Sequence, residues 1–344
     1  MKKFLLIICT FWCFILNAQL DTEHWFAPMS AKAGTGGLEG YLYLSTNETV
    51  PFSVQIFNNN TLYTTVQVSK NNPTQVIIPN SFLIASAQNQ LFTPNNMGLN
   101  VKGPKKFFAN YRFAMSNHAE ILTSKGAAGL GTTFYAGVAP ISGSENHMNA
   151  TIGVTATEDN TVVTISGYNP SITFSDGISS PTRTFTLNKG KSYILDVVSS
   201  TSNINKTGLV GAKIVATKAI SVTNGNFNAA YTSQNLTNND ILMDQAVPVD
   251  RLGKDFVVVK GNGTVTSEME TALIIATENN TQITFNGSGA VINLNEGQHY
   301  LVPSTRYQHQ GNGHYNMNIS STKNVYVYQL LSGATNGNEY ASGE

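Results

Sequence analysis

The chain alternates short apolar runs with polar turns, and one such unit occurs twice almost unchanged. Ala-Thr-Glu-Asp-Asn-Thr occupies residues 156–161, and Ala-Thr-Glu-Asn-Asn-Thr occupies residues 276–281. Each hexapeptide follows an apolar run and precedes alternating apolar and polar residues that end at a glycine, Gly167 or Gly287. Alternation with a period of two predicts β-strands, so each polar hexapeptide is interpreted as a hairpin turn between two strands.

The correspondence continues downstream of both hexapeptides. An Asn-x-Gly sequence lies at residues 188–190 and again at residues 295–297, and each is predicted to form a turn between two strands. Residues 212–222 then match residues 317–327. In both of these segments a Thr-Lys pair is predicted to form a turn that separates two strands.

A weaker first copy of the same pattern lies upstream. Residues 42–49 take the place of the hexapeptide, and the alternating residues 52–56 follow them. Residues 100–106 then precede an aromatic run at residues 107–113, much as the Thr-Lys segments precede apolar runs in the later copies.

The spacing of the copies sets the size of the unit. Thr46, Thr157 and Thr277 hold equivalent positions and are 111 and 120 residues apart. A solenoid repeat has about 20–50 residues, so this period suits a complete β-domain instead. The segments that open the second and third units also match, at residues 130–134 and 252–256.

These patterns predict an all-β protein made of three tandem β-sandwich-like repeats of roughly 110–120 residues. The best helical candidate is short, at residues 81–88. The repeats could pack around a pseudo-threefold axis. A closed, propeller-like arrangement is the alternative, because small repeated sheets also protect their edge strands in that way.

The N-terminus predicts export. Lys2 and Lys3 precede an apolar run at residues 4–16, and Asn17-Ala18-Gln19 follows, which is the three-part pattern of a secretory signal peptide. The apolar run is shorter than the about 20 residues that a transmembrane helix needs. We therefore expect a secreted or cell-surface protein whose mature chain does not insert into the membrane.

The predicted organisation is a signal peptide at residues 1–18 and three β-repeats at residues 19–120, 121–240 and 241–344, of which the first is divergent. In the second repeat, a long polar segment follows the last strand and leads into another unit. By that comparison we expect the chain to continue beyond Glu344, and a sorting domain there is not visible in the sequence.

Cysteine content and charge exclude several classes of function. Cys9 and Cys13 both lie in the predicted signal peptide, so the mature chain has no thiol for a disulfide, a zinc site or a nucleophile. Without Lys2 and Lys3, 18 basic residues remain against 20 acidic ones, a net charge of −2. No basic concentration is present for nucleic acid or anionic lipid.

Several motifs resemble the N-terminal domain family of IgG-Fc-binding proteins. They are His24-Trp-Phe-Ala-Pro28, the segment at residues 121–126 with residues 130–134, the segment at residues 247–253, and the hexapeptide and Asn-x-Gly turns. The resemblance spans roughly residues 21–332. It implies an extracellular β-rich module of large surface or mucus-associated proteins, and its bacterial (Bacteroidetes-like) members resemble surface adhesins. No Fc-contacting residue can be mapped onto this sequence.

Candidate metal ligands are few. Six histidines are present, and none has the spacing of a metal motif. They are His24, His118, His147, His299, His309 and His314. His309 and His314 lie in a Gly-Asn-Gly loop, where a metal site is one interpretation and exposed loop histidines the favoured one.

Acidic residues suggest a second kind of metal site. Glu158-Asp159 and Glu278-Asn279 could supply oxygen ligands for calcium, but Asn and Asp also form turns by bonding their own backbone, and we favour that explanation. Asp240, Asp244 and Asp250 are interpreted as solvated loop charges or strand-end caps.

Aromatic residues could form either a core or a sugar-stacking surface. Alternation predicts Phe107, Tyr111 and Phe113 on one face of a strand and Phe108 on the other, with core packing favoured over a carbohydrate platform. Tyr326 and Tyr328 alternate with valines, so one of those faces should meet solvent or an interface. Gly-Thr-Gly-Gly at residues 34–37 is expected to be a flexible turn. The Asn-x-Ser/Thr sequons, which include Asn47, Asn149, Asn235 and Asn318, are attributed to composition.

The sequence contains no pattern that marks a catalytic set, a metal site or a cofactor site, and its binding residues are unknown. We therefore predict a non-catalytic binding or adhesion module for an extracellular protein or glycan, with residues 137–148, 232–244 and 305–314 as the natural binding segments. Two alternatives stay open: a carbohydrate-active enzyme with carboxylates gathered from strand ends, and a structural stalk.

Overall fold

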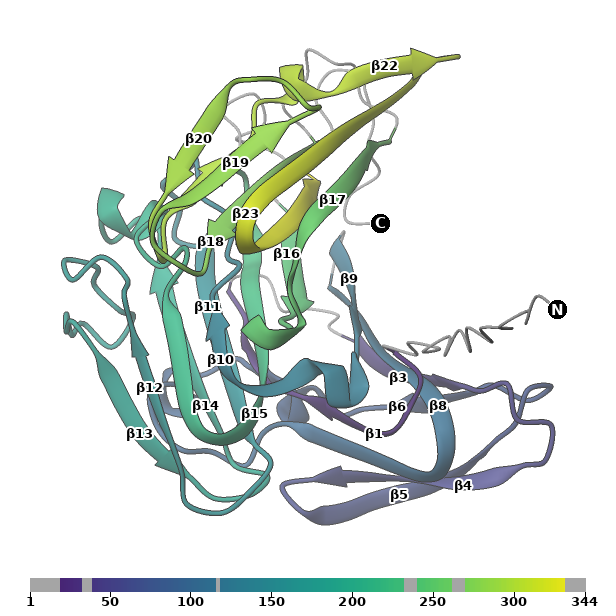
Figure 1. Ribbon diagram of the computed structural model, residues 1–344. Helices are drawn as coiled ribbons and strands as arrows, with labels where there is room; N and C mark the ends of the chain where they lie inside the picture. Colours follow the sequence, from purple (N-terminus) through teal and green to yellow (C-terminus); the bar gives the residue numbers. More distant parts are fainter. Residues whose placement is uncertain (1–18, 33–38, 116–117, 232–239, 262–269, 332–344) are drawn as a thin grey trace, which may run out of the picture.

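The computed structural model describes residues 19–32, 39–115, 118–231, 240–261 and 270–331 (Figure 1). Within these residues the regular structure is β-strand apart from short 3-10 turns, which confirms the all-β prediction. The helical candidate forms instead a two-residue strand, β7 (Ile84–Ala85), between two 3-10 turns. The predicted signal peptide lies outside the described residues.

Three seven-stranded sheets make up most of the fold, and each draws its strands from one continuous part of the chain. The first sheet contains β1 (Asp21–Phe26), β3 (Glu39–Ser45), β4 (Phe52–Asn58), β5 (Thr61–Val68), β6 (Thr74–Ile77), β8 (Leu99–Met115) and β9 (His118–Thr123). The second contains β10 (Leu130–Tyr135), β11 (Asn149–Ala156), β12 (Thr161–Ser166), β13 (Arg183–Leu187), β14 (Ser192–Val198), β15 (Lys213–Ala229) and β16 (Asp240–Gln245). The third contains β17 (Gly253–Lys260), β18 (Glu270–Ala276), β19 (Thr281–Phe285), β20 (Val291–Leu294), β21 (His299–Leu301), β22 (Gln308–Gly311) and β23 (His314–Leu331).

The three sheets share one strand order. It is β5-β4-β8-β3-β6 in the first, β13-β12-β15-β11-β14 in the second and β20-β19-β23-β18-β21 in the third. The connections between strands of the first sheet contain a further parallel pair, β2 (Met29–Ser30) and β7. We call the three sheets, with their connections, units 1, 2 and 3.

Each unit is a sandwich because its long central strand belongs to both layers. In unit 2 the first part of β15 pairs with β10 and β12, and its second part pairs with β11 and β16. The two layers are therefore β13-β12-β15-β10 and β14-β11-β15-β16. The prediction of three β-sandwich-like units is confirmed.

The predicted Thr-Lys turns are wrong, because β15 and β23 continue through them. The strand bends there, and the register shows how. Gly131 pairs with Ile220 and Thr133 pairs with Val215, so an advance of two residues along β10 corresponds to five residues along β15. The same two-to-five shift occurs in units 1 and 3. The extra residues form a bulge, which turns the strand from one layer into the other.

The hexapeptides are also not hairpin turns. β11 and β12 do not pair with each other, because they pair with different parts of β15 and so lie in different layers. Residues 157–160 cross between the layers. Asn160 adopts the left-handed conformation there, with φ of 54°, and Asn280 does so at the equivalent position with φ of 57°. Asparagine tolerates this conformation better than most residues.

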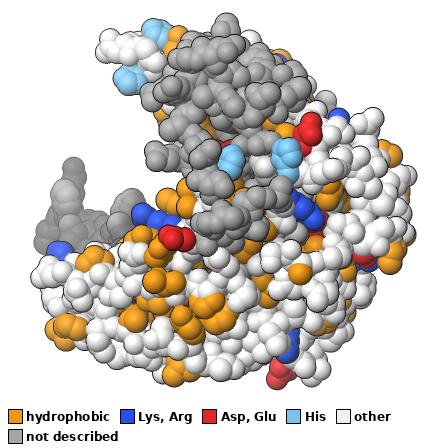
Figure 2. Space-filling model, turned by 180° about the vertical axis from the view of Figure 1, so that it is seen from behind, with side chains coloured by type: hydrophobic (Ala, Val, Ile, Leu, Met, Phe, Trp, Pro, Cys, Tyr) orange, Lys and Arg blue, Asp and Glu red, His pale blue; other side chains and the backbone are white. Residues whose placement is uncertain are grey.

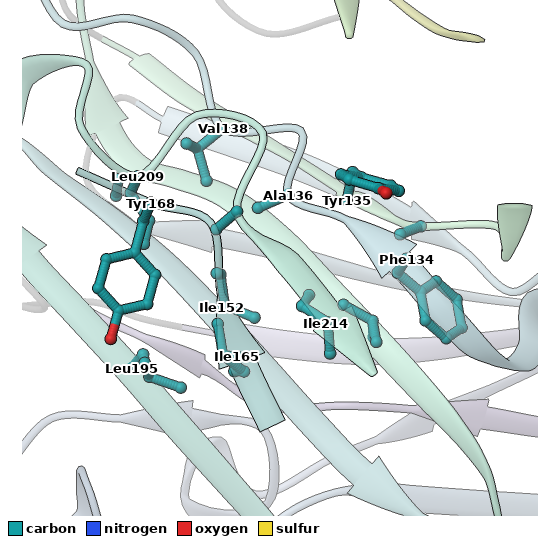
Figure 3. Close-up of a cluster of buried hydrophobic side chains, with 14 of the residues drawn as sticks. Phe134, Tyr135, Ala136, Val138, Ile152, Ile165, Tyr168, Leu195, Leu209 and Ile214 are labelled. Atoms are coloured by element: carbon teal, nitrogen blue, oxygen red, sulfur yellow. The ribbon is translucent and has the colours of Figure 1, made fainter. Parts of the chain in front are cut away.

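The cores of the units run into one another. Ile152, Ile165 and Ile214 pack together inside unit 2 (Figure 3), and the same cluster includes Leu273 and Tyr326 from unit 3. The core of unit 1 likewise takes in residues from β15 and β16 of unit 2. Figure 1 shows the units in an arc, with unit 3 at the top and unit 1 at the lower right.

The predicted limits of the three β-repeats, at residues 120 and 240, stay a prediction. The strands of the first sheet run from Asp21 to Thr123, those of the second from Leu130 to Gln245, and those of the third from Gly253 to Leu331.

Candidate functional site

Two adjoining hollows lie where the three units meet. The first has a volume of about 330 Å³ and is lined by Glu120 of β9, residues 241–244 of β16 and residues 327–331 of β23. The second, of about 240 Å³, shares Asp244, Val327 and Tyr328 with the first. We call these hollows together the central groove. It is built from strands of all three units.

Strand pairing places Glu120 in the groove. β9 follows β8 and pairs with it, and its outer side packs against β16. The carboxylate of Glu120 accepts a 2.7 Å hydrogen bond from the N–H of Ile121, and its other oxygen lies 3.5 Å from the N–H of Met243. Burial raises the pKa of Glu120 to about 8, and the negative charges of Asp244 and Asp240 act in the same direction.

Lys125 and His118 contact the other two carboxylates. Lys125 Nζ lies 2.7 Å from Asp244 Oδ1, and His118 Nδ1 lies 2.9 Å from Asp240 Oδ1. Asp240 is only 2% exposed, and its Oδ1 accepts a hydrogen bond from the N–H of Ile241. Asp240 is therefore a strand-end residue and not a solvated loop charge, which were the two interpretations from the sequence. Asp250, whose side chain is 70% exposed, is solvated.

An aromatic pair forms the wall on the side of unit 3. The rings of Tyr326 and Tyr328 stack with centroids 5.7 Å apart. Tyr326 donates a 2.5 Å hydrogen bond to the carbonyl oxygen of Val247 in the segment between units 2 and 3. Gly137 makes room for Tyr328, because a Cβ at Gly137 would lie 2.1 Å from that ring. The expectation that one face of this strand meets an interface is confirmed.

The other aromatic expectation is also confirmed. Phe107, Tyr111 and Phe113 are at most 2% exposed and belong to the core of unit 1, whereas Phe108 on the opposite face is half-buried. These rings are therefore core residues and not a carbohydrate platform.

The histidines do not come together. His24 is fully buried, with Nε2 2.8 Å from the carbonyl oxygen of Phe107 and Nδ1 3.0 Å from Ser124 Oγ, and burial lowers its pKa. His309 and His314 are exposed on the β22–β23 hairpin, as expected. Among the described residues, no group of three or more His, Cys, Asp or Glu side chains could hold a metal ion.

Asp159 and Asn279, which hold the same position in the two hexapeptides, take part in turn hydrogen bonds. Asp159 Oδ1 accepts a 3.0 Å hydrogen bond from the N–H of Lys189, and at the equivalent place Asn279 Oδ1 accepts one of 3.2 Å from the N–H of Glu296. In both units the side chain joins the hexapeptide to the Asn-x-Gly turn, which supports the turn explanation over a calcium site.

The predicted binding segments contribute unequally to the groove. Gly137 and residues 241–244 line it, so parts of the first two segments are present there. Residues 232–239 lie outside the described residues, as do Gly-Thr-Gly-Gly and the sequon Asn235. The segment at residues 305–314 does not line the groove. The sequon Asn149 is fully buried, and its amide donates a 2.7 Å hydrogen bond to Asp196.

The sequence did not single out Glu120. It is one acid in a short strand, and its position matters only because β16 packs against β9, more than a hundred residues later in the chain. No local signal marks that contact.

On the face shown in Figure 2, Lys and Arg side chains are scattered in small groups among neutral ones.

Two of the motifs that carry the family resemblance, residues 24–28 and residues 121–126, lie at joints between units. The carbonyl of Trp25, in the first motif, accepts a 2.7 Å hydrogen bond from Gln245 Nε2 of unit 2. Gly153 of unit 2 lies against the same segment, since a Cβ there would be 1.7 Å from the carbonyl oxygen of Pro28. The backbone N–H of Lys125 donates a 2.7 Å hydrogen bond to Gln245 Oε1. These two motifs are thus structural and help to assemble the central groove.

A family model described as "IgGFc binding protein" matches residues 119–344, which is 226 of the 344 residues. A search of curated proteins found no match. None of the described segments forms a helix that could span a bilayer.

Proposed function

The chain belongs to the IgGFc-binding protein family, and from that premise we propose that it is a non-catalytic extracellular module that holds a protein ligand in the central groove. Export would follow from the predicted signal peptide at residues 1–18. A protein ligand is favoured over a glycan by the family description, while the described aromatic side chains that could stack on sugars are largely occupied in cores and joints.

One observation carries this proposal: the groove is lined by strands from all three units. Glu120 comes from unit 1, residues 241–244 from unit 2 and residues 327–331 from unit 3. Such junctions are preferred places for binding sites, because side chains from separate elements converge there on a rigid frame. Tyr328, Gln329 and Leu242 supply aromatic, amide and aliphatic contact in one place, which suits a protein surface.

The test is ligand capture by the mature chain with and without changes in the groove. Candidate protein ligands are the Fc fragment of IgG and secreted mucin-type proteins, and a glycan array provides the candidate sugars. Leu242→Ser combined with Gln329→Ala should reduce binding of a captured protein at least tenfold, with an unchanged melting temperature. The matched control, Val257→Ser with Val259→Ser, alters exposed residues of β17 and should bind normally. Equal binding by both double variants would refute the groove as the site.

A hydrolase is the second candidate, because Glu120 and Asp244 face one hollow and differ in environment. Burial raises the pKa of Glu120 to about 8, which keeps it protonated at neutral pH, whereas Asp244 is paired with Lys125. An acid and a carboxylate of this kind are the groups that glycoside hydrolysis requires. Release of sugar from polysaccharides that Glu120→Gln abolishes would establish the hydrolase and overturn the non-catalytic proposal.

The stalk hypothesis predicts a rod of units. The units lie in an arc instead, with cores that continue from one unit to the next (Figure 1). The geometry therefore favours a module that presents a site over a spacer.

A further inference from the structure

Among the described residues, the third unit has no counterpart of β9 and β16 in the other two units. In units 1 and 2 the second part of the long strand lies between two partners, β8 between β3 and β9, and β15 between β11 and β16. In unit 3 the corresponding part of β23, residues 325–331, pairs with β18 on one side. On its other side, Gly253 of β17 pairs with Val325, and no described strand pairs with residues 326–331.

Comparison with unit 2 identifies the backbone groups at this edge. The carbonyl of Val222 accepts a 2.9 Å hydrogen bond from the N–H of Ala246 at the end of β16. Val222 corresponds to Val327, because they pair with the equivalent residues Val154 and Ile274. Backbone groups alternate in direction along a strand. The N–H and C=O groups of Val327, Gln329 and Leu331 therefore point away from β18, toward the place that β16 occupies in unit 2.

That place is the central groove. Residues 327–331 line its first hollow and residues 325–328 line its second, so the edge follows the groove along its length. A strand edge with free backbone groups readily accepts another strand, and proteins usually block or cover such edges. Addition of an extended peptide to an exposed edge is a common mode of peptide recognition.

The charged side chains opposite this edge determine which peptide side chain would be favoured there. Glu120 and Asp244 line the same hollow, with Asp240 close enough to add to the field at Glu120. Lys125 is paired with Asp244 and leaves Glu120 without a cation of its own among the described contacts. A positively charged side chain placed here would offset the charges of Asp244 and Asp240 and would favour the ionised form of Glu120. The chain's own residues 332–344 contain Glu339 and Glu344 and no Lys or Arg, so their charge does not suit the groove.

We propose that the central groove binds an extended segment of a partner protein as an added β-strand on residues 327–331 of β23, with a Lys or Arg side chain of that segment facing Glu120 and Asp244. This rests on the proposed function, because it specifies how the protein ligand is held. The backbone hydrogen bonds supply affinity independent of sequence, and the carboxylates supply the preference for a basic residue.

Peptide probes test the proposal on the full chain. The first probe is the blocked hexapeptide Thr-Val-Lys-Val-Thr-Val, the second has Glu in place of Lys, and two more carry N-methyl groups on one or the other set of alternate residues. Amide hydrogen exchange at Val327, Gln329 and Leu331 is the readout. The Lys peptide should slow exchange at these amides at least tenfold. The Glu peptide should not, and only one of the two N-methylated peptides should retain the effect.

A pair of protein variants isolates the backbone group. Gln329→Pro removes the N–H that faces the groove, while Gln329→Ala keeps it and loses only the side-chain contacts to Val259 and Glu270. The proline variant should lose the response to the Lys peptide, whereas the alanine variant should retain the response at weaker affinity, because it keeps the N–H and loses only the side-chain contact. If proline lowers the melting temperature, Glu120→Gln with Asp244→Asn provides a second variant that should abolish the preference for Lys over Glu.

Three results would overturn the inference. They are unchanged exchange with every peptide, equal responses to the Lys and Glu peptides, and amides at Val327 and Gln329 that are already protected in the free protein as strongly as Val222 and Asn224. The last result would show that the chain itself fills the edge. If peptides fail while the groove variants still abolish capture of a protein ligand, the proposed function stands and strand addition fails.

Discussion

The hydroxyl of Thr157 donates a 2.6 Å hydrogen bond to the carbonyl oxygen of Ala219, at the bend of β15. Thr277 makes the same bond to Asn324, at 2.7 Å, and Thr46 makes it to Lys106, at 2.8 Å. One threonine thus ties the layer-crossing segment to the bend of the long strand in each unit. The lysines add to this joint, since Lys218 and Lys323 donate to the carbonyl oxygens of Asp159 and Asn279.

Removal of this hydroxyl should weaken the unit. Thr157→Val keeps the shape of the side chain and leaves the Ala219 carbonyl with only the 3.3 Å bond from the Thr157 N–H. We expect a loss of about 1 kcal/mol in the free energy of unfolding, measured by urea titration. Thr184→Val, on the surface, removes a 3.1 Å contact to Thr164 and should change stability by less than about 0.5 kcal/mol. Equal effects would contradict the special role of Thr157.

Three glycines should rank in a definite order when changed to alanine. At Gly153 the new Cβ would meet the backbone oxygen of Pro28 at 1.7 Å, so the joint between units 1 and 2 has to move. At Gly137 it would meet the ring of Tyr328, which can shift in part. At Gly289 it would meet nothing within 4 Å.

We therefore expect Gly153→Ala to lower the melting temperature most, Gly137→Ala by an intermediate amount, and Gly289→Ala hardly at all. Overpacking in a close-packed interior costs about 1–3 kcal/mol or more, and the rigid backbone neighbour should put Gly153 at the upper end. Differential scanning fluorimetry gives the ranking. A neutral Gly153→Ala would show that the first motif does not pack against unit 2 as described.

Local pattern was enough to predict the all-β class and the buried face of the aromatic strand. Alternation placed Phe107, Tyr111 and Phe113 on the buried face correctly, because one side of a sandwich strand always faces the core. It could not predict that residues 157–160 cross between layers, since a polar turn looks the same whether its flanking strands pair with each other or with a third strand. The central groove was out of reach for the same reason: Glu120 and Met243 meet only through long-range packing.

His24 should make the protein sensitive to mild acid. Burial lowers its pKa below the usual 6.5, so the unfolded chain binds a proton more readily than the folded one. Stability is therefore fully present above pH 6.5 and is lost as the pH falls below it. His24→Gln, which keeps a donor for the Phe107 carbonyl, should lose less unfolding free energy than the wild type between pH 7.5 and 5.5. Parallel losses in urea titrations would argue against a neutral buried imidazole.

Glu120 should produce the opposite dependence at higher pH. Its pKa rises from 4.5 to about 8 on folding, so between these values the folded protein holds a proton that the unfolded chain has released. Stability then falls as the pH rises through this window. From pH 5 to pH 9 the loss should be on the order of 1–3 kcal/mol, after allowance for partial exposure. Glu120→Gln cannot ionise and should remove this slope, whereas Asp250→Asn, at an exposed site, should keep it. Identical slopes for the wild type and Glu120→Gln would mean that the carboxyl is already ionised at neutral pH. A basic ligand residue would then find a fixed negative charge there instead of a proton that must first leave.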